Sequence, residues 1–326
     1  MNMTPPTPSP MRRKVYCILS ARSLPYADKA MASLVAHCDE DLDLTLITDS
    51  ADDKIALVDA MQSIDVPARH QWRVCAQSEA DERAAVVLAK YPHIAAFRFG
   101  HPCWRKITDP LLFAAPDEEM VILDPDLYFP NRFRFEPTPA RGILLMYQPP
   151  SCLLPDDVVR RAYAANIRLA HHVDIGVAHA SNNLDLAWLD QLIATLGGTQ
   201  LPRAMHIEAI VWAALAMREG GGYLDPDHWH CWRNTQWKRA ALRLGASGRN
   251  VLRVERFGDM KCFHGGGVAK WWVPEALKAG ELPTPRAIPE RRAPAPFEEL
   301  TLAAYDSTQR LKRLARRLGY YKLVGG

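Results

Sequence analysis

Three kinds of segment are missing from this chain of 326 residues. No apolar run approaches the ~20 residues that a helix needs to cross a bilayer. The seven cysteines are scattered, odd in number and without CxxC pairs, which excludes a zinc ribbon and argues against a disulfide framework. The N-terminal apolar run, Val15–Leu19, is too short for a signal-peptide core. We therefore expect a reducing, cytoplasmic location.

A strong net charge is also missing. The 40 Lys and Arg residues nearly balance the 37 Asp and Glu residues, giving +3, so the chain does not bind nucleic acid through overall charge. With 48% hydrophobic and 24% charged residues, the composition is that of a globular protein and excludes a mostly disordered chain or a coiled coil. From Arg286 onward there are nine basic and four acidic residues. The positive charge is thus concentrated in the tail.

Strand-like and helix-like segments alternate along most of the chain, which predicts an α/β fold with a mixed, mainly parallel sheet flanked by helices. The expected strands are 14–19, 43–48, a strand from Met120, 142–147, 173–179 and 249–257. The expected helices are 26–38, 80–90, 104–113, 184–196, 206–218 and 297–318. A loop rich in Trp and His is expected at 221–237. The expected organisation is a disordered Pro-rich leader (1–13), one large domain (14–282), a Pro-rich linker (283–296) and a basic amphipathic helix (297–326).

Two carboxylates, Asp124 and Asp126, follow the apolar run Met120–Leu123. Such a run is typical of a strand buried on both faces, and ligands of α/β sheets bind at the carboxyl ends of strands. Carboxylates there suit a hard divalent cation, Mn²⁺ or Mg²⁺, that keeps positions open for phosphate oxygens. The alternative is a solvated turn, since Asp-Pro is a common turn dipeptide.

Three glycines, Gly265–Gly267, lie between His264 and Lys270. Glycines let backbone amides approach an anion closely. The histidine can bind a metal and the lysine a phosphate. The alternative for the glycines alone is a flexible turn.

Together these two segments resemble glycosyltransferase family 8. His264, Gly267, Lys270 and Trp272 match H-x-x-G-x-x-K-x-W of that family's C-terminal motif, which usually has proline where this chain has Trp271. LDPD resembles the family's LDxD, the metal motif of GT-A glycosyltransferases. Looser likenesses are Tyr26–Ser33, the segment 104–107, VDIGVAH at 173–179 and the helix around Glu208. Asp174 stands where asparagine is usual, and no glutamine follows Glu208.

The resemblance implies a GT-A fold and a metal-dependent transfer of a sugar from a nucleotide diphosphate, UDP above all, to a glycan or lipid-linked acceptor with retention. It implies that Asp124, Asp126 and His264 hold the cation, which acts as a Lewis acid on the leaving diphosphate. The expected donor contacts are Lys106, Gly267 and Lys270, with Ser20, Tyr26 and Asp49 toward the nucleoside. An oxocarbenium-like sugar needs a nearby carboxylate, and Asp174 and Glu208 are the candidates for this catalytic role, the alternative for each being a capping or surface acid.

Two other functions compete with this one. A haloacid-dehalogenase-like phosphatase also has a DxD after an apolar strand, but its motif lies near the N-terminus and has Thr or Val where this chain has Tyr128. A non-catalytic nucleotide-sugar-binding module is the other; the intact Asp, His and Lys set argues against a degraded site.

Three further features have two interpretations each. His171-His172 and His228–His230 are either a second metal site or packed and surface histidines. Trp229, Trp232 and Trp237 either form a platform for an acceptor sugar or pack a long loop. The last helix combines leucines at helical spacing with Arg310, Lys312, Arg313, Arg316 and Arg317. It either lies on the inner face of an anionic membrane or docks on the domain.

Overall fold

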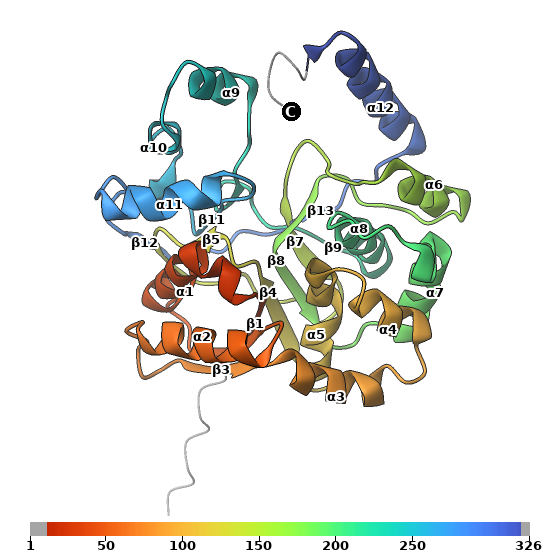
Figure 1. The fold of residues 1–326 in the computed structure, drawn as a ribbon, viewed down its shortest axis with the longest axis horizontal. Helices are drawn as coiled ribbons and strands as arrows, with labels where there is room; N and C mark the ends of the chain where they lie inside the picture. The colour runs from red at the N-terminus through yellow and green to blue at the C-terminus, as the bar shows by residue number, and fades with distance from the viewer. Residues whose placement is uncertain (1–11, 321–326) are drawn as a thin grey trace, which may run out of the picture.

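An eight-stranded sheet forms the centre of the computed structural model, which describes residues 12–320 (Figure 1). In spatial order its strands are β13 (Ala295–Pro296), β9 (Gly221–Tyr223), β7 (Ile143–Tyr147), β8 (Val173–Ser181), β4 (Glu119–Leu123), β1 (Arg13–Ile18), β2 (Leu42–Ile47) and β3 (Gln71–Cys75). The pairs β3–β2, β2–β1, β1–β4 and β7–β9 are parallel, and the other three pairs are antiparallel. The predicted mixed, mainly parallel sheet is confirmed.

Helices cover both faces of this sheet. One face is covered by α1 (Leu24–His37) and α2 (Ala51–Gln62). The other is covered by α3 (Gln77–Val87), α4 (Pro92–Arg98), α5 (Arg105–Phe113), α6 (Asp156–Ala164), α7 (Leu186–Leu196) and α8 (Ile207–Glu219). On β1, Val15 and Cys17 belong to the core under α1 and α2, while Tyr16 and Ile18 belong to the core on the opposite face. This double burial is why the central strands are apolar at successive positions.

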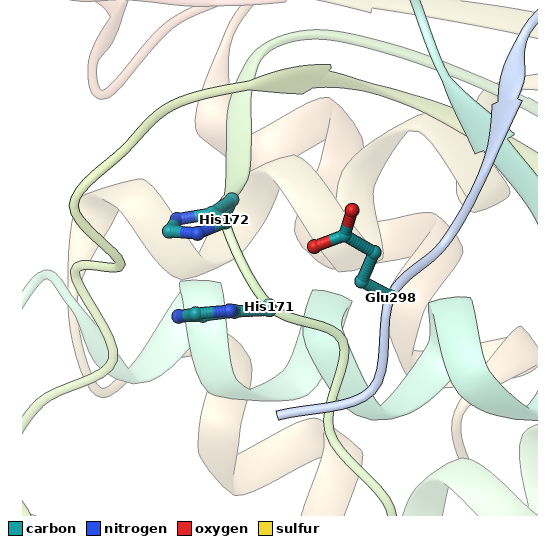
Figure 2. A group of neighbouring side chains, drawn as sticks. All are labelled: His171, His172 and Glu298. Atoms are coloured by element: carbon teal, nitrogen blue, oxygen red, sulfur yellow. The ribbon is translucent and has the colours of Figure 1, made fainter. Parts of the chain in front are cut away.

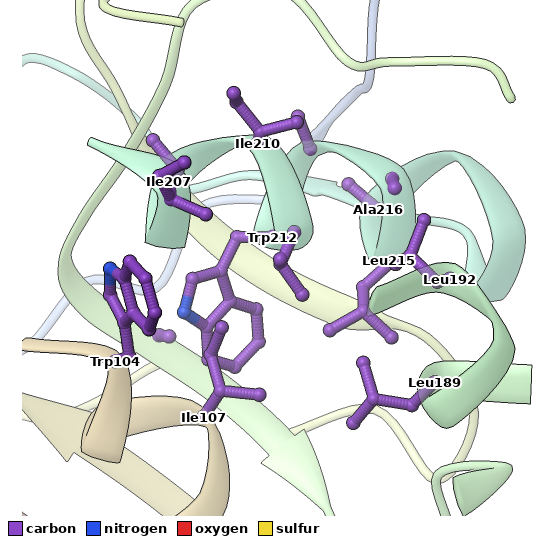
Figure 3. Close-up of a cluster of buried hydrophobic side chains, with 14 of the residues drawn as sticks. Trp104, Ile107, Leu189, Leu192, Ile207, Ile210, Trp212, Leu215 and Ala216 are labelled. Atoms are coloured by element: carbon purple, nitrogen blue, oxygen red, sulfur yellow. The ribbon is translucent and has the colours of Figure 1, made fainter. Parts of the chain in front are cut away.

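The larger core gathers around α8, which is apolar on nearly all sides. Figure 3 shows Trp104 and Ile107 of the α5 region meeting Trp212 of α8 and Leu189 and Leu192 of α7. Trp104 also stacks on Phe97 with ring centroids 4.5 Å apart, and its indole N–H donates to the Ala204 carbonyl at 3.0 Å. The large apolar side chains thus fix α5, whose basic residues reach the functional edge of the sheet.

A three-stranded sheet lies beyond the carboxyl end of β4. Its order is β10 (Trp229–Cys231), β11 (Cys262–His264) and β5 (Leu127–Tyr128). A further pair consists of β6 (Arg132–Phe133) and β12 (Ala287–Ile288). Three helices pack on this part: α9 (Gln236–Arg243), α10 (Gly248–Leu252) and α11 (Ala269–Lys278). The glycine segment 265–267 leads into α11.

The strand expected at 249–257 is wrong. Residues 248–252 form α10, which starts at Ser247, whose hydroxyl accepts from the Asn250 N–H at 3.2 Å. Val251 and Leu252 are buried, whereas Val254 is 56% exposed. A local N-cap and adjacent buried residues therefore favour a helical turn where a strand was expected.

The Pro-rich segment 283–296 is fastened to the body rather than extended between two units. It contains β12, in which Ala287 pairs with Arg132, and β13, in which Ala295 pairs with Tyr223. Proline suits such short edge strands because it cannot donate in a ladder. At the other end, Arg13 already lies in β1, and residues 1–11 of the expected leader are outside the described part.

The last helix, α12 (Leu302–Arg317), begins at Thr301, whose hydroxyl accepts from the Ala304 N–H at 3.2 Å. Its first half is anchored: Tyr305 is buried near Tyr163, and Asp306 pairs with Arg160 at 2.8 Å. Among residues 12–320, no helix has both the length and the apolar content to cross a membrane.

We predict that His179 makes the protein sensitive to acid. The side chain is fully buried on β8, and burial together with Arg13 and Lys261 lowers its pKa to about 3. An unfolded histidine titrates near 6.5, so the unfolded state binds a proton that the folded state refuses. Stability is therefore expected to fall as the pH drops below ~6.5. In urea unfolding, the free energy of unfolding of the parent should decrease between pH ~7 and ~4.5. The decrease for His179→Gln should be smaller by about 2–3 kcal/mol. Equal losses in both proteins would contradict this role.

Candidate active site at the carboxyl end of strand β4

The two sheets meet where β4 ends. Asp124 follows β4 directly, and its N–H donates to the Gly176 carbonyl of β8 at 2.8 Å. Asp126 precedes β5, in which Leu127 pairs with His264 of β11. The short β5–β11 pairing therefore brings the histidine from 140 residues away to the DxD segment.

The structure brings Asp124, Asp126 and His264 together. The His264 Nε2 atom is 3.2 Å from an Asp126 oxygen and 3.7 Å from an Asp124 oxygen. One ligand atom from each residue lies within 4.8 Å of the others. Two carboxylates and one imidazole form a donor set that suits Mn²⁺ or Mg²⁺, so these residues fit the expected cation.

Two lysines accompany the carboxylates. The Lys106 ammonium is 2.7 Å from Asp124 and 3.0 Å from Glu208, and the Lys270 ammonium is 3.4 Å from Asp126. Lys106 is buried at the start of α5, and Lys270 lies in the first turn of α11. Each lysine neutralises one carboxylate, so both lie within reach of an anion that approaches the cluster.

Asp174 lies behind His264. Its Oδ1 is 2.8 Å from the His264 Nδ1 and also accepts from the Gly176 N–H at 2.9 Å. A Cβ on Gly176 would lie 2.5 Å from the same Nδ1. A glycine at 176 therefore makes room for the imidazole, while Asp174 holds the ring with Nε2 toward the DxD. The sequence did not indicate this contact, because it joins β8 to β11.

The charges shift one another's pKa values. Burial opposes ionisation of Asp126, but His264 and Lys270 outweigh it and lower the pKa of that carboxyl. Burial also opposes protonation of His264, yet Asp174 and Asp126 raise its pKa well above the usual value. For Glu208, burial raises the pKa to about 8, against the opposing effect of Lys106.

Of the residues expected toward the nucleoside, Tyr26 lies beside the carboxylate and lysine group, whereas Ser20 does not. The Tyr26 ring lies under the Lys270 ammonium at 5.0 Å and meets the Trp271 ring edge-on, also at 5.0 Å. Tyr26 thus belongs to the cluster. Ser20 precedes the short helical turn after β1, and none of its contacts reaches the described metal-ligand set. Gly267 has φ +67°, which favours glycine, with open space around it.

Asp49 forms an ion pair with Arg105, a residue that was not among those predicted from the sequence. Arg105 donates to Asp49 at 2.8 Å and to the buried Asp109 at 2.7 Å, and Asp109 also accepts from Arg98 at 2.7 Å. Arg105 is next to the predicted Lys106, and its i,i+4 spacing to Asp109 was the available signal. This ion-pair network anchors α5 to the end of β2.

Of the three tryptophans considered as a sugar platform, Trp229 and Trp232 are buried in the core, with Trp229 stacked on Phe135. Only Trp237 is exposed, by 51%. The packing interpretation is therefore right for the first two.

A second group of potential ligands lies at the start of β8. His171 and His172 stack with ring centroids 3.5 Å apart, and Glu298 faces them from the segment before α12 (Figure 2). One ligand atom from each of the three residues lies within 4.8 Å of the others. The stacking of the two rings agrees with the interpretation as packed histidines.

Comparison with known proteins gives structural neighbours only. No family model matches the chain, and no curated protein matches it. Mouse xyloside xylosyltransferase 1 has a TM-score of 0.49 and 11% identity, over 79% of this chain and 98% of the other. The galactosyltransferase LgtC, solved with donor and acceptor sugar analogues, has 0.44 and 11%, over 85% and 98%. The glycosyltransferase GlyE of Streptococcus pneumoniae has 0.43 and 10%, over 84% and 65%. Each TM-score is below 0.5, so these likenesses establish neither activity nor substrate.

We predict that Gly176→Ala weakens cation binding. The added methyl group must displace the His264 ring, and loss of such support costs roughly 10- to 100-fold in metal affinity. Electron paramagnetic resonance of free Mn²⁺ measures the dissociation constant without activity. Gly266→Ala is the matched control, because its Cβ would lie 3.8 Å from His264 Nε2, an ordinary contact. Equal Mn²⁺ affinity in both variants would refute the steric argument.

Proposed function

We propose that this protein is a metal-dependent glycosyltransferase of the GT-A type. It transfers a sugar from a nucleotide diphosphate, a UDP-sugar by the motif resemblance, to a glycan or lipid-linked acceptor, with retention. The observation that carries this proposal is the convergence of Asp124, Asp126 and His264 beside two lysines at the carboxyl end of β4. The cytoplasmic location expected from the sequence is part of the same proposal.

Asp124, Asp126 and His264 would hold the cation, which would supply Lewis-acid stabilisation of the leaving diphosphate. Lys270 and Lys106 contribute charge-assisted contacts to phosphate oxygens. Both ammonium groups already lie on the carboxylates, at 3.4 Å and 2.7 Å. With a cation on those carboxylates, Lys106 and Lys270 would be free to contact phosphate oxygens. Tyr26 limits the reach of Lys270 by lying under its ammonium.

Asp174 and Glu208, the two candidates for a carboxylate at the reacting sugar, are better placed to orient other side chains. Asp174 accepts from His264 Nδ1–H and so presents Nε2 as a ligand. Glu208 is 2% exposed and contacts the Lys106 ammonium at 3.0 Å. We propose that Asp174 positions His264 and that Glu208 positions Lys106.

The expected test is nucleotide release from a panel of UDP-sugars in the presence of Mn²⁺. The parent protein should release UDP by transfer or slow hydrolysis, and Asp126→Asn should reduce the rate at least about a hundredfold because a ligand is lost. The exposed Asp65→Asn serves as a control with the same change of charge. Circular dichroism should show native folding in both variants. Full activity of Asp126→Asn in saturating Mn²⁺, or no cation requirement in the parent, would refute the proposal.

We also propose that α12 lies on anionic membrane. Leu311, Leu314 and Leu318 are 69%, 54% and 71% exposed. Five basic residues alternate with them: Arg310, Lys312, Arg313, Arg316 and Arg317. No acidic residue follows Asp306 in this helix, and Asp306 is paired with Arg160. Exposed leucines between cations fit the boundary of an anionic bilayer.

Co-sedimentation with phosphatidylserine-rich vesicles tests this contact. The parent should bind, and binding should weaken as salt screens the cations. The variant Leu311→Asn/Leu314→Asn/Leu318→Asn should lose most of the binding. Leu302→Asn, at the start of the same helix, should keep it. Absence of binding by the parent, or equal binding by all three proteins, would refute the membrane contact.

A further inference from the structure

A cavity of about 790 Å³ lies apart from the cluster formed by Asp124, Asp126, His264 and the two lysines, called the metal cluster below. It opens to solvent and is lined by residues of β10, α9, the turn after α10 and the segment that contains β12. His230 of β10 lines it, whereas the neighbouring Cys231 lies with Asp174 and His264. Successive side chains of a strand point to opposite faces. The cavity and the metal cluster therefore occupy opposite faces of the small sheet.

Most of the charge in this cavity is paired. Lys238 binds the buried Glu255, and Arg286 binds Asp259.

Arg292 contacts three carboxylates: Asp225 at 2.9 Å, Glu290 at 3.2 Å and Asp227 at 3.6 Å. Every carboxylate that lines the cavity thus has a cation beside it.

Two guanidinium groups of the lining have no carboxylate partner among residues 12–320. They belong to Arg233, which is half-buried, and Arg256, which is exposed. These two guanidinium groups, and not a net charge, are what the cavity offers to an anion, because the other charged groups of the lining are paired. A guanidinium offers a planar fork of donors that suits a carboxylate or a phosphate.

The remaining lining suits a sugar ring. Trp237 is 51% exposed and provides an aromatic face, and Val254 is 56% exposed beside it. His228 is 3% exposed, and its Nδ1 has no hydrogen-bond partner among the described residues. The volume lies within the ~300–1,000 Å³ range of small-molecule sites, which combine an apolar face with a few polar groups.

We propose that this cavity binds an acidic sugar, with the anionic group on Arg233 and Arg256 and the ring on Trp237. A uronic acid and a sugar phosphate share this chemistry. The site is separate from the proposed donor site, and the inference does not depend on transferase activity.

Calorimetry on the full chain tests the ligand class. Glucuronic acid and glucose 1-phosphate are the probes, with glucose and inorganic phosphate as comparisons. At least one acidic sugar should bind roughly tenfold or more tightly than glucose and than phosphate, with a dissociation constant on the order of 1 mM or lower. Tighter binding of the uronic acid or of the sugar phosphate identifies the source of the anion. No binding of either, or equal binding of inorganic phosphate, would overturn the proposal.

Variants test the location. Arg256→Ala and Trp237→Ala change exposed side chains and should each weaken the acidic sugar about tenfold. Arg239→Ala is the matched control on α9, because Arg239 does not line the cavity and bonds to the Asn234 carbonyl. Lys270→Ala should also leave this affinity unchanged, since Lys270 belongs to the metal cluster. Loss of binding in Lys270→Ala with retention in Arg256→Ala would place the ligand at the donor site and overturn the proposal.

Discussion

The imidazole of His264 is held between carboxylates from two different sheets. Asp174 contacts Nδ1 from the central sheet, and Asp126 faces Nε2 from the segment that leads into β5. A buried charge is stable only when it is paired, and removal of one partner leaves the other uncompensated. Around this ring, Lys106 and Lys270 complete an alternation of positive and negative groups. This alternation of charges joins the two sheets at this edge, beside the apolar core that they share.

Features governed by local sequence could be predicted, and those set by tertiary pairing could not. The run Met120–Leu123 identified a doubly buried strand, and α1, α5, α7 and α8 lie close to their expected ranges. The convergence of His264 on the DxD came from the motif resemblance, because no pattern within either segment specifies a partner 140 residues away. The contact of Asp174 with His264 was invisible for the same reason: it requires the register of β8 against β4.

The errors have physical causes of their own. The segment 249–257 was expected to be a strand, yet Ser247 caps a helix there, and Val251, Leu252 and Phe257 are buried. The prolines of 283–296, which suggested a linker, occur beside the short edge pairings of β12 and β13, where a missing N–H costs nothing.

The segment from β12 to β13 crosses from the β6–β12 pair to the outer edge of the central sheet. Its pairing at Arg132 and a bond from the Arg286 N–H to Asn131 join residues 155 positions apart. Contacts of such long sequence separation form late in folding, because loop closure must precede them. During synthesis, β9 therefore has an uncovered edge until the last part of the chain emerges. A nascent chain held at that stage already contains Asp124, Asp126 and His264, together with a strand edge available to other chains. Because this segment joins the β6–β12 pair to β9 only after most of the chain is made, the edge of β9 is open to wrong pairing until then.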